Sequence, residues 1–117
     1  MSTNENNSHI VFETDDFLHA NGTYQLFVTF NGMLATDNIG FYKQSYKTKS
    51  GQTRYFAVGL WNAPKAFPCF DEPEFKAKFQ LTIAHDKGLQ AVSNMPIYER
   101  RVINDHLVES EFKSTPP

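Results

Sequence analysis

The feature that most constrains this chain is a series of short runs in which apolar and polar residues alternate, each bounded by turn residues. In the clearest run, residues 23–30, Tyr24, Leu26, Val28 and Phe30 share one face. Alternate side chains of a β-strand point to the same side, so this spacing predicts a strand. Similar runs predict strands at residues 9–13, 39–48, 53–58, 79–83, 89–93, 97–103 and 106–112. The pattern is typical of an all-β antiparallel β-sandwich or barrel, and no helix is predicted.

Turn residues between the runs predict how the strands connect. The stretch Lys49-Ser50-Gly51-Gln52 separates two alternating runs, so residues 39–48 and 53–58 are expected to form a hairpin. The basic residues among the aromatic residues of this hairpin are Lys43, Lys47, Lys49 and Arg54. They are expected to protect an exposed sheet edge rather than bind single-stranded nucleic acid.

Residues 61–76 form the irregular centre of the chain and contain three prolines. Proline removes a backbone donor and fixes φ, so this stretch is predicted to be an ordered loop. Burial of Phe67, Phe70 and Phe75 is worth about 1.5–3 kcal/mol each. The loop is therefore expected to tuck under a sheet edge.

Length and composition limit the class of protein. The chain has 117 residues, which suits one domain, here residues 9–117 after a polar N-terminal tail at 1–8. The net charge of -2 argues against nucleic acid as a partner. No apolar stretch reaches the roughly 18 residues of a membrane span. Cys69 is the single cysteine, so no internal disulfide is expected and the compartment stays unassigned.

The acidic pair Asp71 and Glu72 is the first catalytic candidate. Neighbouring residues of an extended chain point to opposite faces, so these two carboxylates cannot flank one scissile bond. We expect them to cap backbone donors within the loop or to pair with Lys65 and Lys76.

The metal candidates are His9, His19, His85, His106 and Cys69. No two of the histidines lie three or four residues apart, and the zinc motif HExxH is absent. The histidines are expected to be solvated or singly hydrogen bonded. Cys69, in an apolar context, is expected to be a small buried hydrophobe. The sequence thus predicts no catalytic residue and no metal ligand.

Six segments of the chain form a distinctive series. Residues 66–77 read AFPCFDEPEFKA, and the other segments are NGTYQL at 21–26, GFYKQSY at 40–46, RYFA at 54–57, SNMP at 93–96 and FKSTP at 112–116. In this order they resemble the N-terminal domain of the M1 (aminopeptidase N-like) zinc aminopeptidases, whose AFPCFDEPxFKA motif residues 66–77 match almost residue for residue. The structural motif of the family corresponds here to Phe67, Pro68, Cys69, Phe70, Asp71, Glu72 and Pro73.

The resemblance implies a saddle-like β-sandwich that packs against a catalytic domain following it in the parent protein. That domain would hold the zinc and carry the family's GxMEN and HExxH motifs, neither of which occurs here. The implied function is a non-catalytic N-terminal domain that meets peptide substrates only through its parent. The chain stops at Pro117, where the family's next strand begins, so the last strands are expected to be missing.

One segment departs from the family pattern. Between the strand at 54–57 and the FPCFDEP motif, the family has a loop resembling TQFEPTDAR, whose Gln or Glu contacts the first residue of the substrate. The corresponding residues here are Gly59, Leu60, Trp61 and Asn62, of which Asn62 alone is polar. This loop is expected to be degenerate. The alternative function is a stand-alone pseudoenzyme or binding module that associates with an intact aminopeptidase.

Overall fold

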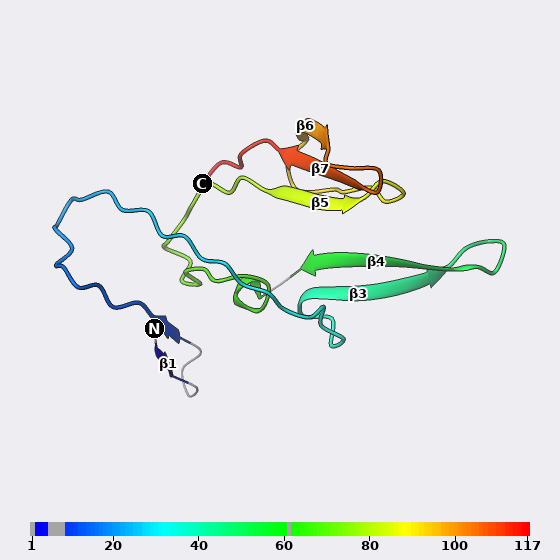
Figure 1. The fold of residues 1–117 in the computed structure, drawn as a ribbon. Helices are drawn as coiled ribbons and strands as arrows, with labels where there is room; N and C mark the ends of the chain where they lie inside the picture. Colours follow the sequence, from blue (N-terminus) through cyan, green and yellow to red (C-terminus); the bar gives the residue numbers. More distant parts are fainter. Residues whose placement is uncertain (1, 5–8, 61) are drawn as a thin grey trace. The chain divides into compact units, whose positions relative to one another are not determined.

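The computed structural model describes residues 2–4, 9–60 and 62–117. It divides into two units, Met1–Gly32 and Met33–Pro117. Every named strand in both units pairs antiparallel with its neighbour (Figure 1). The predicted all-β antiparallel class is therefore confirmed. None of the helical segments described is long and apolar enough to span a membrane.

The first unit contains one small sheet. Strand β1 (Ser2–Asn4) pairs with β2 (His9–Val11). The predicted tail at 1–8 includes β1, while its residues 1 and 5–8 lie outside the described residues, as does Trp61.

The strand predicted at residues 23–30 was wrong, because this segment pairs with no described strand. The Tyr24 hydroxyl instead bonds the backbone N–H and, at 3.2 Å, the carbonyl of His19. Leu26 and Phe30 are more than half exposed. Alternation makes a segment suitable for a sheet, but a strand also needs a neighbouring edge for its backbone hydrogen bonds.

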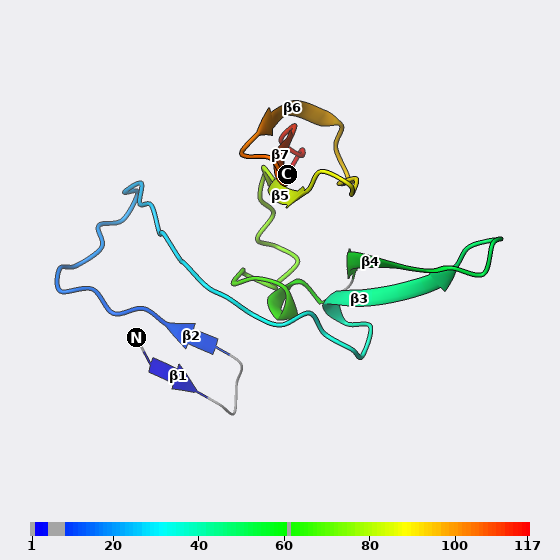
Figure 2. The same cartoon turned by 45° about the vertical axis from the view of Figure 1, so that its right-hand side comes forward.

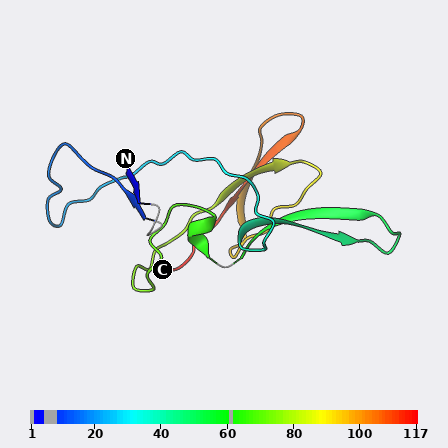
Figure 3. The same cartoon turned by 90° about the horizontal axis from the view of Figure 1, so that it is seen from below.

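The second unit begins with the predicted hairpin. Strand β3 (Gly40–Lys47) pairs along its whole length with β4 (Thr53–Leu60). The turn is closed by hydrogen bonds between Thr48 and Gln52 and between Gly51 and Thr48, and Gly51 has a φ of 82°. Figure 3 shows the hairpin as a two-stranded ribbon ending in this turn.

A three-stranded sheet with the order β5-β7-β6 follows (Figure 2). Its strands are β5 (Thr82–Asp86), β6 (Ile97–Val102) and β7 (Leu107–Phe112). The strands predicted at 97–103 and 106–112 are confirmed, whereas the one predicted at 79–83 begins only at Thr82. Residues 89–93 form no strand. The segment begins in a turn, where the N–H of Leu89 donates to the carbonyl of Asp86.

Three buried side chains of the second unit lie on one face of β7. Val108, Ser110 and Phe112 are buried, and the intervening Glu109 and Glu111 lie on the other face. Tyr42 of β3 is also buried. Large apolar side chains of the second unit nevertheless remain exposed, among them Phe41, Tyr55 and Phe75. Much of its apolar surface is therefore left without cover.

Candidate functional site

The predicted substrate-cleft loop begins at the last residues of β4. Gly59 lies opposite Phe41 and Leu60 opposite Gly40. Asn62 follows with a left-handed backbone, φ 55°, and precedes the 3-10 helix η1 (Ala63–Lys65). Its carbonyl accepts a hydrogen bond from Lys65 at 3.1 Å, and its side chain makes no capping bond. Asn62 therefore acts as a turn residue at the end of the strand.

Helix η1 lies against the first residue of β3. A Cβ atom placed on Gly40 would come within 2.7 Å of the Cβ of Lys65, and Gly40 has a φ of 74°. Glycine is required here both for the backbone conformation and for the space. The contact fixes the segment after β4 beside the start of β3.

The FPCFDEP motif is an exposed loop with two aromatic contacts. Phe67 packs edge-on against Phe79, with centroids 6.1 Å apart, and Phe70 packs against Phe75 at 5.4 Å. Phe70 is nevertheless 81% exposed and Phe75 53% exposed. The expectation that this loop tucks under a sheet edge was therefore wrong. Pro68 and Pro73 keep its backbone out of a ladder, and the rings shield each other only in part.

The acidic residues of the motif also differ from expectation. Lys65 pairs with Asp37, 3.7 Å away. Among the described residues, neither Asp71 nor Glu72 forms an ion pair with a lysine. Glu72 does accept a hydrogen bond within the loop, from the N–H of Phe75, but it does so through its backbone carbonyl and not its carboxylate. These carboxylates remain exposed to solvent.

Cys69 is half-buried in the loop. Burial, with a smaller contribution from the negative charge of Asp71, raises the pKa of its thiol above the ordinary value. A thiol with a raised pKa is less often a thiolate and so is a weaker nucleophile and metal ligand. The sequence predicts a small buried hydrophobe here, whereas the side chain of Cys69 is only half-buried.

The described residues do not fit a zinc site. In that part of the chain, no three His, Cys, Asp or Glu side chains lie close enough together to hold a metal ion. Both ring nitrogens of His85 are engaged, Nδ1 with the carbonyl of Asp86 and Nε2 with the hydroxyl of Ser110, each at 2.9 Å. His85 thus makes two hydrogen bonds where at most one was expected.

Two polar features were not singled out from the sequence. Arg101 of β6 bonds Glu99 at 2.7 Å, Glu111 at 3.0 Å and Glu109 at 3.4 Å. The hydrogen bond from Arg101 lowers the pKa of Glu99, and Glu99 in turn raises the pKa of Arg101. The i, i+2 spacing of Glu99 and Arg101, and of Glu109 and Glu111, could have shown that these four residues share a face.

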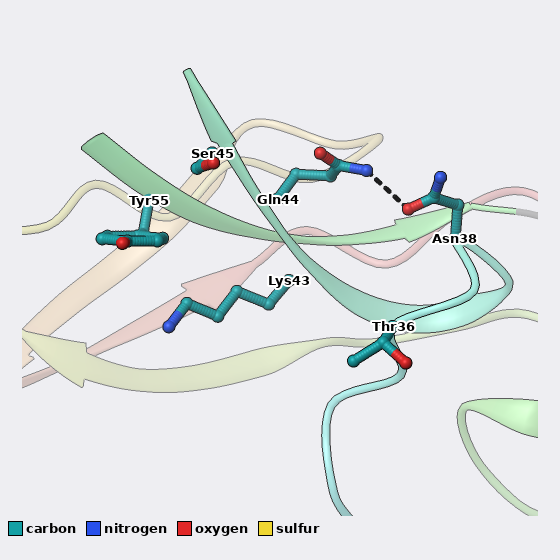
Figure 4. A pocket seen from close by; sticks show the side chains of 6 residues that line it. All are labelled: Thr36, Asn38, Lys43, Gln44, Ser45 and Tyr55. Carbon is teal, nitrogen blue, oxygen red and sulfur yellow. Dashed lines mark hydrogen bonds between the residues drawn. The ribbon is translucent and has the colours of Figure 1, made fainter. Parts of the chain in front are cut away.

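The second feature is a polar hollow of about 310 Å³ beside the hairpin (Figure 4). Lys43 lies with its ammonium 4.2 Å from the ring centroid of Tyr55, and Gln44 donates to Asn38. Thr36 and Ser45 complete the lining. Of its lining residues, the sequence had drawn attention to Lys43 alone, as a residue expected to protect a sheet edge.

Comparison with known proteins supplies the family. Residues 1–117 match the Peptidase M1 N-terminal domain. Glutamyl aminopeptidase of Bos taurus is 36% identical over 115 residues, which are 93% of this chain and 12% of that protein. Aminopeptidase Ey of Gallus gallus is 37% identical over 117 residues, covering 95% of this chain and 12% of that protein.

A third relative, endoplasmic reticulum aminopeptidase 1 of Rattus norvegicus, is 37% identical over 101 residues, or 84% of this chain and 11% of that protein. The chain therefore spans about a tenth of the length of these relatives. The antiparallel all-β architecture and the FPCFDEP loop agree with the family match. The chain belongs to the family of N-terminal domains of M1 peptidases.

Proposed function

We propose that this chain is a non-catalytic domain of a zinc aminopeptidase and that it forms one side of the parent's substrate cleft. The observation that carries the proposal is the match of all 117 residues to the M1 N-terminal domain. The zinc would be held by the catalytic domain of the parent, since the described residues of this chain offer no suitable donor set. Zinc in such a site polarises the scissile carbonyl and activates water.

A peptidase assay tests the non-catalytic role. The purified chain is incubated with an amino-acid arylamide, with and without added zinc, beside an intact M1 aminopeptidase as the positive control. We expect turnover by the intact enzyme and none by the chain at any zinc concentration. Zinc-dependent turnover that co-purifies with the chain and disappears with a chelator would refute the proposal.

The loop that follows β4 has a reduced role in this proposal. The family's loop brings a Gln or Glu to the substrate's first residue, whereas here Gly59 and Leu60 lead to the turn residue Asn62. Because no acidic or amide group other than Asn62 is present in residues 58–64, recognition of the substrate's free amino end should be weak.

A chimera tests this reduced role. The domain is joined to the catalytic part of an M1 relative, and residues 58–64 are kept or replaced by the family's TQFEPTDAR loop. We expect the family loop to raise kcat/KM by about tenfold or more, the effect of one charged hydrogen bond. Equal kcat/KM values for the two chimeras would show that this loop does not contact substrate.

The second candidate is a binding module that associates in trans with an intact aminopeptidase. It is favoured by the exposed aromatic side chains of the hairpin, of which Tyr46 is 55% and Phe56 46% exposed. Large exposed apolar patches commonly mark protein contacts. Size-exclusion chromatography with light scattering, using the chain mixed with an intact aminopeptidase, would show a complex if this candidate is right and two separate species if it is wrong.

A further inference from the structure

Within the part of the chain that the structure describes, the outer edge of β4 is a row of backbone groups without a hydrogen-bond partner. On the far side of β3, Ala35 donates to the carbonyl of Phe41 and accepts from the N–H of Lys43. Gly59 lies opposite Phe41 and Ala57 opposite Lys43. Directly opposed residues of an antiparallel pair point their backbone groups either toward each other or away from each other. Phe41 and Lys43 point their backbone groups toward Ala35 and so away from β4, which means that Gly59 and Ala57 point theirs away from β3. Every second residue of a strand shares this orientation, so the outward N–H and C=O groups of β4 belong to Thr53, Tyr55, Ala57 and Gly59.

The two edges of the hairpin differ. The outer edge of β3 is partly occupied by Ala35 and carries Lys43 and Lys47, which discourage pairing. In contrast, β4 pairs only with β3 among the described strands (Figure 2), and Arg54 is the one charged residue in its sequence TRYFAVGL. A long edge with so few charges readily accepts a further strand.

The two faces of the hairpin define what such a strand must carry. On one face Lys43 extends over Tyr55 and so places a positive charge above β4. On the other face the rings of Tyr46 and Phe56 lie 6.2 Å apart and remain half exposed. Successive side chains of an added strand alternate between these faces. Acidic side chains would meet Lys43, and apolar ones would cover Phe56.

We propose that the outer edge of β4 binds an extended peptide segment in which acidic residues alternate with apolar ones. The segment adds to the hairpin as a third strand. Its backbone pairs with the outward groups of β4, its carboxylates face Lys43, and its apolar side chains cover Phe56. The proposal does not depend on the aminopeptidase function proposed above, because it concerns the strand edge and not the loop after it.

Binding of a labelled peptide to the full chain tests the proposal. The probe is a blocked peptide as long as β4 (8 residues) that alternates valine with glutamate, followed by fluorescence anisotropy. Two control peptides replace glutamate with lysine or methylate the backbone amides that would bond β4. We expect only the unmodified glutamate peptide to bind. Equal binding of the lysine or methylated peptide, or no binding by any peptide, would overturn the proposal.

Three variants of the chain locate the site. Lys43→Glu should reverse the preference, so that the lysine peptide binds and the glutamate peptide loses about tenfold or more in affinity. Ala57→Pro removes an outward donor without breaking the β3–β4 ladder and should weaken binding, whereas Ser45→Pro on the outer edge of β3 should not. Unchanged preference in Lys43→Glu, or light scattering that shows self-association of the chain without peptide uptake, would contradict the proposal.

Discussion

At the scale of single residues, Gly40 is the position where the fold depends most on the absence of a side chain. Its φ of 74° strains any other residue, and a Cβ would lie 2.7 Å from the Cβ of Lys65. We predict that Gly40→Ala lowers the free energy of unfolding by about 1–3 kcal/mol or more, because strain and overlap add. Urea unfolding followed by circular dichroism measures the change.

Substitutions at two other glycines measure the backbone strain and the steric overlap separately. Gly51 has a φ of 82° but open space around it, whereas Gly32 has open space and no positive φ. Gly51→Ala should therefore show the conformational strain alone, and Gly32→Ala should leave stability almost unchanged. A smaller loss for Gly40→Ala than for Gly51→Ala would show that η1 does not constrain Gly40.

Cys69 gives a pH-dependent prediction at the same scale. Burial and the charge of Asp71 raise the pKa of the thiol, so the rate of alkylation by iodoacetamide should reach half its maximum at a higher pH than for an ordinary cysteine. Asp71→Asn removes the smaller of the two causes and should move the midpoint partly back, while Glu72→Gln should not. An unchanged midpoint in Asp71→Asn would exclude the charge of Asp71 as a cause.

At the scale of elements, the pair β6–β7 is joined on one face by Arg101 and three glutamates. Glu99 has a lowered pKa in the folded chain because Arg101 bonds it. The pair therefore adds stability above the unfolded pKa of Glu99, and this contribution is lost as the pH falls through the lower folded value. We predict that Arg101→Gln raises the pKa of Glu99 and makes stability less sensitive to acid. A side-chain NMR titration and urea melts from neutral to acidic pH measure both.

Arg100 supplies the matched control for this element. It is next to Arg101 in the sequence, but it lies opposite Ser110 on the other face of the sheet. Arg100→Gln should therefore leave the pKa of Glu99 unchanged. If both substitutions shift Glu99 equally, the effect comes from net charge rather than from the hydrogen bond.

The elements also show how far the sequence could predict the structure. The hairpin β3–β4 and the pair β6–β7 were predictable because each turn lies between two alternating runs that pair with each other. Residues 23–30 alternate equally well, but no described strand pairs with them. Local pattern specifies which face is apolar, and only tertiary context specifies the partner. For the same reason the FPCFDEP loop was recognisable as a loop while the exposure of Phe70 was not predictable.

At the scale of the whole chain, the exposed surface is the main property that local patterns could not show. The 40% hydrophobic content is sufficient for a core, yet large apolar side chains such as Phe41, Tyr55 and Phe70 remain exposed. Large exposed apolar patches commonly mark surfaces that another part of a protein covers. This supports the proposal that the domain lies against the catalytic part of a parent protein.

The same exposure gives a prediction for unfolding. A chain that leaves large apolar side chains exposed when folded buries less surface on folding than a compact domain of equal length. The urea m-value is proportional to the surface exposed on unfolding, so we expect a value below that of a compact domain of equal length. Strong binding of the dye ANS should accompany the low m-value. A full-size m-value without ANS binding would mean that the chain covers its aromatic residues by itself and needs no further domain to do so.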